Sequence, residues 1–524
     1  MCPVCTNVWV RDVGNYRYPV EKIGKCPTQY GKEDPRCNIK GCDIVQAAVV
    51  RYKDRIFQYK RFGPMVVDGN SAWSKNSVNQ SKVLMNLKID FSGKCEKYPS
   101  ETMNEMYELK IATPDIHSKT ALLVAKSPWG VLRGLETFSQ LVTYTEDSRY
   151  EIQGIQIFDF PRFAYRGFML DTSRHFLSKS IIKKNLELME QSKMNVFHWH
   201  ITDDPSFPFQ SIVYPQLSNK GAFNKNTHIY KPSDVTDIIE FARIRGIRVI
   251  PEFDTPGHTE SWGKGVKNLL TPCYETGTGK ISGYYAINPI LNSTYEFLEN
   301  FFGEVVKVFN DQYLHLGGDE LSFDCWKSNP DLNKFMKEKN YTEYSQLEDY
   351  YEQKLVDIIK SFPGDHQYMV WEEVFLNGVK LRPESIIHVW RGGYKDTLAK
   401  ATTAGFRTLL SSCWYLNIIH YGEDWPNYYK CDPQDFEGTQ AQKNLIIGGE
   451  ACMWGEYVDG TNVVSRSWPR ASVPAERLWS DQNVTDITDA NIRLNKFRCL
   501  LLRRGYDVEP PTGPGFCPDD YLVE

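Results

Sequence analysis

Residues 195–254 contain an apolar run, NVFHWHITDD (195–204), then an amphipathic helical pattern, SDVTDIIEFARIRG (233–246), and a second apolar run, IRVIPEFD (247–254). This strand–helix–strand order is typical of parallel sheets built from βα units. The same alternation continues from about Pro161 onward. The eight predicted strands are RGFMLD (166–171), NVFHWHITDD (195–204), IRVIPEFD (247–254), YLHLGGDE (313–320), YMVWEE (368–373), IIHVWR (386–391), RTLLSS (407–412) and LIIGGEACMW (445–454). Eight such strands predict an α/β fold of the (β/α)8 TIM-barrel class.

The part of the chain before the barrel has a different pattern. SKVLMNLKIDF (81–91) and MYELKIAT (106–113) alternate polar and apolar residues, and SPWGVLRGLETFSQLVTY (127–144) is typical of a helix packed on the resulting sheet. We therefore expect a small N-terminal α/β domain over residues 1–155, followed by a catalytic barrel with a C-terminal tail over residues 156–524.

The charged residues exclude some classes of partner. The 524-residue chain has 61 Lys and Arg against 66 Asp and Glu, a formal charge of −5, and the two signs are mixed along the whole length. Nucleic-acid binding normally requires a basic patch. No apolar run approaches the roughly 18 residues of a membrane span. We expect no nucleic-acid partner and no membrane span.

The cysteines and glycosylation sequons indicate the compartment. Thirteen cysteines are typical of an oxidising environment in a chain of this kind. A zinc knuckle at Cys2 and Cys5 is disfavoured, because no second ligand pair follows nearby. Acceptor sequons begin at Asn79, Asn292, Asn340 and Asn483. We expect a lysosomal or secreted protein, with the signal peptide not evident in this sequence.

Two adjacent acids follow the fourth predicted strand. In YLHLGGDE the glycines allow a tight turn, which then presents Asp319 and Glu320. Two carboxyl groups in one pocket split in pKa, so that one donates a proton while the other stabilises positive charge. Hydrolysis of a glycosidic bond needs both functions. The dipeptide alone is weak evidence, because exposed acid pairs are common.

Histidines and further acids lie at neighbouring strand ends. HWHITDD contributes His198, His200, Asp203 and Asp204, and PEFDTPGH contributes Asp254 and His258. A chain of Asp and His side chains can hold the pKa of a catalytic acid. The alternative is a metal site built from the same residues. The spacing leaves both interpretations open.

Aromatic residues near the strand ends indicate the substrate class. Trp371, Trp390, Trp414 and Trp454 all lie close to predicted strand ends, and Tyr415 follows one of them. A single Trp usually packs in a core, but several at one barrel face favour a carbohydrate pocket, where rings stack on apolar sugar faces.

Several longer segments carry a family resemblance. They are PRFAYRGFMLDTSRHF, NVFHWHITDDPSFPF, PEFDTPGHTESWG, LHLGGDE, VWEEVF, HVWRGG, GGEACMWGEYVD and WPRASVPAERLWS. Together they resemble glycoside hydrolase family 20, and within it the animal lysosomal β-N-acetylhexosaminidase subunits. The resemblance implies removal of terminal non-reducing GlcNAc or GalNAc from glycoconjugates by a retaining, substrate-assisted mechanism, without cofactor or metal.

The resemblance also implies roles for individual residues. Glu320 is expected as the general acid/base, Asp319 as the residue that orients the substrate's 2-acetamido group, and Tyr415 as a donor to its carbonyl oxygen. Asp203 and His258 are expected to support the acid. The substrate-binding residues implied by the likeness are Arg166, Trp371, Trp390, Trp454, Glu456 and Asn417.

The resemblance further implies covalent links and an assembly. Family spacing pairs Cys42 with Cys95, Cys273 with Cys325, and Cys499 with Cys517, and leaves Cys452 as a buried free thiol. The partners expected are terminal β-linked N-acetylhexosamine glycans or glycolipids, and a second subunit in a dimer.

The sequence leaves alternatives for the substrate and for the activity itself. Ile418 stands where the anion-accepting subunits of the family have Arg, so the pocket lacks an evident counter-charge for a sulfate or a sialic carboxylate. One alternative is an exo-acting chitooligosaccharide hydrolase of the same family, which the sequence does not separate from the first interpretation. Another is a catalytically idle carbohydrate-binding protein, which the intact Asp319 and Glu320 disfavour.

Overall fold

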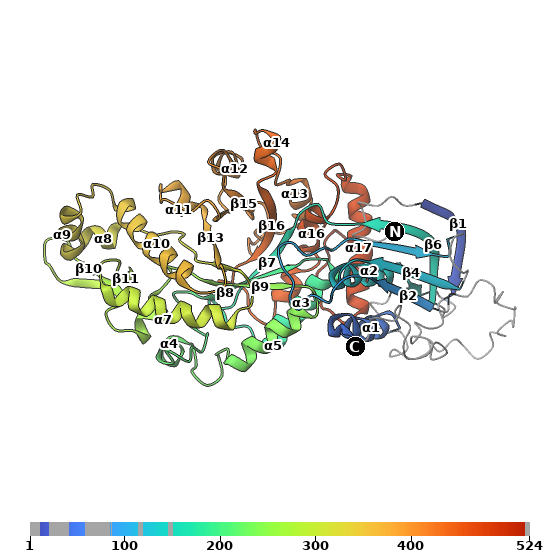
Figure 1. The fold of residues 1–524 in the computed structure, drawn as a ribbon, viewed down its shortest axis with the longest axis horizontal. Coiled ribbons are helices and arrows are strands. Elements are labelled where there is room, and N and C mark those ends of the chain that lie inside the picture. The colour runs from blue at the N-terminus through green and yellow to red at the C-terminus, as the bar shows by residue number, and fades with distance from the viewer. Residues whose placement is uncertain are drawn as a thin grey trace.

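The computed structural model describes residues 11–19, 41–57, 84, 86–113, 119–144 and 150–518. An open sheet with two helices at one end of the molecule adjoins a larger barrel (Figure 1). Cys2, Cys5 and the sequon at Asn79 lie outside the described residues.

The larger unit is a closed barrel of eight parallel strands, as predicted. Around the barrel their order is β12, β13, β14, β15, β16, β7, β8, β9, with β9 pairing to β12. The strands are β7 (Tyr165–Asp171), β8 (Val196–Thr202), β9 (Arg248–Phe253), β12 (Tyr313–His315), β13 (Gln367–Trp371), β14 (Ile386–Val389), β15 (Arg407–Leu410) and β16 (Ile446–Met453). Each lies within or overlaps one of the eight predicted strands.

Helices and a hairpin surround the barrel. The longer helices are α3 (Lys179–Gln191), α5 (Pro232–Arg243), α7 (Asn292–Val308), α9 (Pro330–Glu338), α10 (Tyr344–Ser361), α12 (Tyr394–Thr403), α16 (Ser472–Trp479) and α17 (Ile487–Arg503). The shorter ones are α4 (Gln216–Gly221), α6 (Glu260–Gly265), α8 (Asp324–Ser328), α11 (Glu372–Leu376), α13 (Trp425–Lys430), α14 (Gln440–Lys443) and α15 (Val463–Ser467). The hairpin pairs β10 (Leu270–Tyr274) with β11 (Ile281–Ile287). Apolar faces of the helices pack on the strands in one large core.

The barrel interior is unusually polar for a packed core. Every residue of β7 and β8 is buried, as expected for strands covered on both faces. Among the buried side chains of the barrel strands are four histidines and two glutamates: His198, His200, Glu252, His315, His388 and Glu450. Burial of so many ionisable groups requires that they pair with one another.

The smaller unit is an open sheet with strand order β1, β6, β3, β4, β2. Its elements are β1 (Arg11–Pro19), α1 (Asp43–Ile56), β2 (Asn86–Phe91), β3 (Tyr107–Ile111), β4 (Thr120–Ala125), α2 (Pro128–Leu141), β5 (Thr143–Tyr144) and β6 (Tyr150–Asp159). Helix α2 is buried along nearly its whole length, because it contacts the sheet on one side and the barrel on the other. Arg133 on α2 donates to the carbonyl of Gly246, just before β9, at 2.9 Å.

The cysteine pairings implied by the family resemblance are confirmed. Disulfides join Cys42 to Cys95, Cys273 to Cys325, and Cys499 to Cys517, while Cys452 is a buried free thiol. A fourth bond, Cys413–Cys431, was not predicted.

Two further observations concern the exposed sequons and the helices. The sequon residues Asn292, Asn340 and Asn483 are exposed. Within the described ranges, no helix combines the length and apolar character that crossing a membrane requires.

Candidate active site

The predicted acids lie at the carboxyl ends of the barrel strands, the face where barrel enzymes place their active sites. Asp319 and Glu320 follow β12 across a turn in which Gly317 and Gly318 have φ of +75° and +93°. A Cβ at Gly317 would lie 1.7 Å from Asp254 Oδ1, and one at Gly318 would lie 2.3 Å from a methyl group of Val374. Only glycine therefore fits this turn.

The turn gives the two acids different surroundings. Asp319 is 7% exposed, and its Oδ1 lacks a hydrogen-bond partner. The Glu320 side chain is 56% exposed, and its backbone has φ of +51°, a conformation that L-residues rarely adopt. The structure thus presents one carboxylate inside the barrel mouth and the other at its open edge.

His258 stands between these acids and Asp203. Its Nε2 lies 3.8 Å from Asp319 Oδ1 and 3.7 Å from Glu320 Oε2. Its Nδ1 lies 3.3 Å from Asp203 Oδ1. His258 also has a positive φ, +53°, in the loop after β9. The strained backbone places one imidazole within reach of four carboxylates, those of Asp203, Asp204, Asp319 and Glu320.

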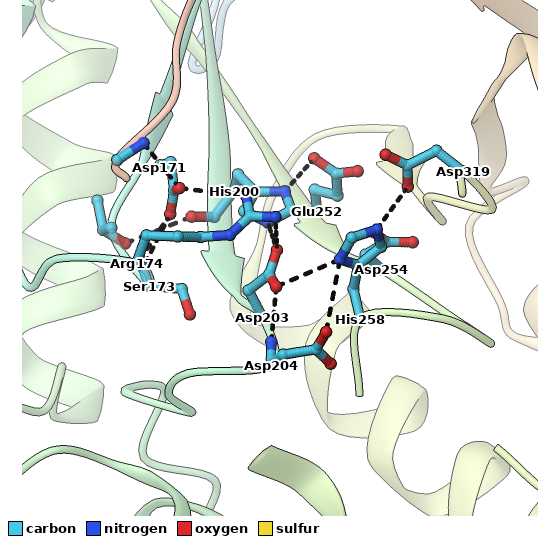
Figure 2. A network of polar contacts seen from close by, with 12 residues as sticks. Asp171, Ser173, Arg174, His200, Asp203, Asp204, Glu252, Asp254, His258 and Asp319 are labelled. Atoms are coloured by element: carbon cyan, nitrogen blue, oxygen red, sulfur yellow. Dashed lines mark hydrogen bonds and ion pairs between the residues drawn. The ribbon is translucent and has the colours of Figure 1, made fainter. Parts of the chain in front are cut away.

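Asp203 receives three cations from three different elements (Figure 2). Besides His258, its partners are His200 Nε2 at 2.8 Å and Arg174 Nη2 at 2.8 Å. Its neighbour Asp204 instead accepts from the backbone N–H of Glu260 at the start of α6, at 2.9 Å. The two acids nevertheless stay side by side, because Asp204 Oδ2 also lies 3.9 Å from His258 Nδ1.

The chain of contacts continues into the barrel. His200 Nδ1 lies 2.6 Å from Glu252 Oε2, and the indole Nε1 of Trp371 donates to Glu252 Oε1 at 2.7 Å. Glu252 and His200 are both buried. A continuous series of side chains thus connects β13, β9 and β8 to His258.

The charges of the side chains alternate in sign along the series from Glu252 through His200 and Asp203 to His258. Burial alone would lower the pKa of His200, but the charge of Glu252 and the hydrogen bond to Asp203 raise that pKa to about 10. His258 behaves in the same way: burial opposes its charge, while Asp203 and Asp319 raise its pKa to about 9. Burial would raise the pKa of Asp203, yet hydrogen bonds from His200 and His258 hold it far below its usual range. Both histidines are therefore cationic at neutral and acidic pH.

Asp254 lies beside Asp319 in a buried position. Burial raises its pKa well above the usual range, and the charges of Asp319 and Glu252 raise it further. Its Oδ1 accepts from the backbone N–H of Gly318 at 2.9 Å. Burial and the two neighbouring carboxylates thus disfavour the charged form of Asp254.

Four aromatic side chains from consecutive strand ends form a closed set of contacts. The centroid distances are 6.4 Å for Trp371–Trp390, 5.9 Å for Trp390–Tyr415, 6.5 Å for Tyr415–Trp454 and 6.1 Å for Trp371–Trp454. Trp371 is fully buried, Trp454 is 8% exposed, and Trp390 and Tyr415 are partly exposed. Trp414, which the sequence grouped with them, is instead buried in the main core. The four rings therefore form one apolar aromatic cluster at this face of the barrel.

Arg166 does not lie at this face, so its predicted role in holding a sugar's hydroxyl groups is wrong. It is the second residue of β7, at the amino end of the strand, and is fully buried. Its guanidinium donates to the carbonyls of Lys193 and Phe163, at 2.9 and 2.8 Å, and to Glu105 at 2.6 Å. Arg166 therefore links the barrel to the N-terminal domain.

The arginine at the active face is Arg174, which sequence reasoning missed. It follows β7, contacts Asp171 at 3.2 Å in addition to Asp203, and lies 4.9 Å from the ring centre of Trp454. Its position beyond the carboxyl end of the predicted strand 166–171 was the available signal, because that end faces the site.

The two remaining predicted residues lie in the loops after β15 and β16. Glu456 is exposed, and its charge contributes to the raised pKa of Arg174, after those of Asp171 and Asp203. Asn417 is partly exposed, its Oδ1 lacks a partner, and its carbonyl accepts from Arg466 at 3.3 Å. Ile418 beside it is 62% exposed.

One histidine of the proposed metal alternative is already engaged at both ring nitrogens. His200 Nδ1 lies 2.6 Å from Glu252 and its Nε2 2.8 Å from Asp203. An imidazole that donates from both nitrogens has no lone pair for a metal ion. The geometry therefore favours a charge chain over the metal alternative at His200.

Comparisons with known proteins agree with this geometry. Residues 163–482 match the family described as "Glycosyl hydrolase family 20, catalytic domain", and residues 15–141 match "beta-acetyl hexosaminidase like". The chain is 48% identical to beta-hexosaminidase subunit alpha of Rattus norvegicus over 490 residues, 92% of this chain and 89% of the relative. It is 47% identical to the human beta subunit over 478 residues, 91% of this chain and 83% of the relative.

Solved structures show the same fold. The chitobiase of Flavobacterium johnsoniae superposes with a TM-score of 0.75 at 28% identity, covering 96% of this chain and 72% of that one. An exo-β-N-acetylglucosaminidase from Vibrio harveyi, solved with N-acetylglucosamine, has a TM-score of 0.75 at 24% identity and covers 98% of this chain and 78% of that one.

The two arginines at opposite ends of β7 give a matched test. Arg174→Lys loses the forked contact to Asp171 and Asp203, so kcat/KM on an aryl N-acetyl-β-glucosaminide should fall by about ten- to a hundredfold. Arg166→Lys should instead lower the urea midpoint and keep kcat/KM within about twofold, because its partners lie at the domain boundary. An Arg166→Lys enzyme of normal stability with weakened substrate binding would contradict the assignment.

Proposed function

The chain belongs to glycosyl hydrolase family 20, and from this premise we propose that it is an exo-β-N-acetylhexosaminidase. It removes terminal non-reducing GlcNAc or GalNAc from glycoconjugates with retention of configuration. The observation that carries the proposal is the pair Asp319 and Glu320, presented by one glycine turn beside four aromatic rings.

In this mechanism the substrate supplies its own nucleophile. Glu320 donates a proton to the glycosidic oxygen as the bond to the anomeric carbon breaks, and the 2-acetamido oxygen forms a bond to that carbon. The product is an oxazolinium ring and a released alcohol. Water then attacks the anomeric carbon, and Glu320 takes a proton from that water. The bond between the anomeric carbon and the acetamido oxygen breaks, which restores the N-acetyl group. Two displacements at one carbon give net retention.

Asp319 acts on the acetamido nitrogen. Its buried carboxylate has an unpartnered oxygen, which suits an N–H that becomes more positive as the ring forms. A low-dielectric site strengthens this interaction relative to water. The aromatic set of Trp371, Trp390, Tyr415 and Trp454 provides walls for the methyl group and the sugar ring, and the Tyr415 hydroxyl donates to the acetamido oxygen.

Glu320 faces the opening, where the leaving group departs. His258 and Asp203 behind it form the support that holds the acid in place, since both are buried far more than Glu320. Arg174, Glu456 and Asn417 lie around the same opening and suit hydrogen bonds to the hydroxyls of the non-reducing sugar. The nearby cation Arg466 already contacts Asn417 through its backbone.

Within the family, chitooligosaccharides are the alternative class of natural substrate. A chitooligosaccharide hydrolase uses the same chemistry and differs in the sites that bind the leaving sugar. One structural relative is named a chitobiase, whereas the relatives of higher identity are named β-hexosaminidase subunits. The higher identity favours the glycoconjugate assignment.

The assembly we propose is a dimer on the secretory route to the lysosome or the cell exterior. Ile418, Ile419, Tyr421 and Tyr457 are exposed in the loops after β15 and β16, and such clustered apolar groups are typical of interfaces. The relatives are named as alpha and beta subunits. Disulfides and exposed sequons support the secretory route.

Light scattering on protein from a secreting animal-cell host tests this assembly. The expected particle has twice the mass of the 60.6 kDa chain after enzymatic removal of N-glycans, and a larger mass before it. Ile419→Ser with Tyr421→Ser should shift it to a monomer. A wild-type monomer without glycans would contradict both the dimer and the route.

The catalytic assignment is tested by Glu320→Gln and Asp319→Asn. Glu320→Gln should lower kcat on a glycoside with a poor leaving group by about a hundred- to ten-thousandfold, because an amide cannot donate the proton. Asp319→Asn should weaken binding of a thiazoline mimic of the oxazoline by about tenfold or more. Asp324→Asn, an exposed acid on α8, is the matched control and should change neither. Normal turnover in Glu320→Gln, or equal thiazoline affinity in Asp319→Asn, would refute the assignment.

A further inference from the structure

We propose that Glu252 is a positioning residue that joins the two halves of this site, the indole wall at Trp371 and the charge chain that ends at His258. The inference rests on the proposed function, since it concerns the acetamido wall and the proton donor of that reaction. Glu252 touches neither substrate nor the reacting atoms. It acts through Trp371 and His200, whose N–H groups donate hydrogen bonds to its carboxylate.

Each carboxylate oxygen of Glu252 accepts a hydrogen bond from one half of the site. Oε1 accepts from Trp371 Nε1 at 2.7 Å, and Oε2 accepts from His200 Nδ1 at 2.6 Å. Both donors belong to other strands, β13 and β8, whereas Glu252 is on β9. One buried carboxylate therefore fixes the relative position of three strand ends.

Each donor leads directly to a different part of the reaction. The Trp371 ring contacts Trp390 and Trp454, so its tilt sets the shape of the space for the acetamido group. His200 passes the constraint through Asp203 to His258, which faces Asp319 and Glu320. A shift of Glu252 would move both the wall and the support of the acid.

The surroundings explain why an anion is needed. His198 and His200 from β8 and His315 from β12 approach Glu252 at 3.0, 2.6 and 3.3 Å. Asp254, which directly follows β9, adds a further carboxyl group nearby. These histidines hold the pKa of Glu252 well below its usual range in spite of burial. A carboxylate satisfies donors at both oxygens, but an amide would turn its NH₂ group toward one of them.

Trp371 has no other polar anchor of this kind. One face stacks on His388 at a centroid distance of 4.1 Å, which limits where the ring can lie but not how it is rotated in its plane. The hydrogen bond from Nε1 to Glu252 supplies that missing restraint.

A second buried glutamate provides a matched control. Glu450 on β16 is as buried as Glu252 and accepts from His198 at 2.7 Å and from Tyr165 at 2.8 Å. It belongs to the same interior network, but its hydrogen-bond partners are not the indole wall or His200. A merely structural role for a barrel glutamate predicts the same kinetics for both Gln variants.

The test uses two substrates that separate the halves of the site. A dinitrophenyl N-acetyl-β-glucosaminide needs little proton donation, so it reports on the acetamido wall, while a simple alkyl glycoside needs the acid as well. Wild-type turnover of both substrates tests the proposed function by itself. The variants Glu252→Gln, Glu450→Gln, Trp371→Phe and His200→Gln are then compared in kcat and KM.

Glu252→Gln should lower kcat about tenfold or more on the dinitrophenyl substrate, and by a further fivefold or more on the alkyl glycoside, with KM changed less than about threefold. Trp371→Phe should affect both substrates equally, and His200→Gln mainly the alkyl glycoside. Glu450→Gln of equal urea midpoint should retain kcat within about threefold on both. Loss on only one substrate, or equal losses in the two Glu variants, would overturn the proposal.

A second measurement decides the matter if Glu252→Gln does not fold. Trp371→Phe and His200→Gln are then combined in a double-mutant cycle on the dinitrophenyl substrate. The same cycle is measured on the alkyl glycoside, on which both single variants lose activity. Two donors that share one carboxylate should couple, so on the alkyl glycoside the double variant should deviate from additivity in kcat by about threefold or more. Additive effects would overturn the role of Glu252.

Discussion

The active site depends on one carboxylate, Asp203, that accepts from three cations delivered by three different barrel loops or strands. Arg174 comes from the loop after β7, His200 from β8 and His258 from the loop after β9. A buried anion with three cationic partners is stable only if all of them stay in place. This requirement explains why strained backbone at His258 and Glu320 is tolerated: the ion pairs beneath the loops hold them there.

The two ends of strand β7 divide stability from chemistry. At the amino end, Arg166 and Arg133 share Glu105 and bind the N-terminal sheet to the barrel. At the carboxyl end, Asp171 accepts from the backbone N–H of Gly455, at 2.9 Å, and contacts Arg174, so it orders the loops around the opening. The N-terminal domain therefore contributes to the site indirectly, by supporting the closed end of the barrel.

Much of this arrangement could be predicted from the sequence, for physical reasons that also mark its limits. Apolar runs flanked by helical patterns located all eight barrel strands, because burial on both faces leaves little choice of residues. Asp319 and Glu320 could be predicted because they follow the two glycines of YLHLGGDE, and only glycine fits the tight turn that presents them. Arg166 was misassigned because its role was taken from the family resemblance, although it begins the predicted strand 166–171 and therefore lies at the end away from the opening. The link from Trp371 to His200 through Glu252 joins residues far apart in sequence, and no local pattern encodes it.

The central claim is that the substrate's acetamido oxygen, held against Trp371 and Asp319, is the nucleophile. It is tested most directly with aryl glucosaminides that carry N-acetyl, N-fluoroacetyl, N-difluoroacetyl and N-trifluoroacetyl groups. Each fluorine withdraws electron density from the attacking oxygen, so kcat/KM should fall along the series, by about tenfold or more overall. A rate that does not depend on fluorination would mean that a protein carboxylate or water attacks the anomeric carbon, and would contradict this account.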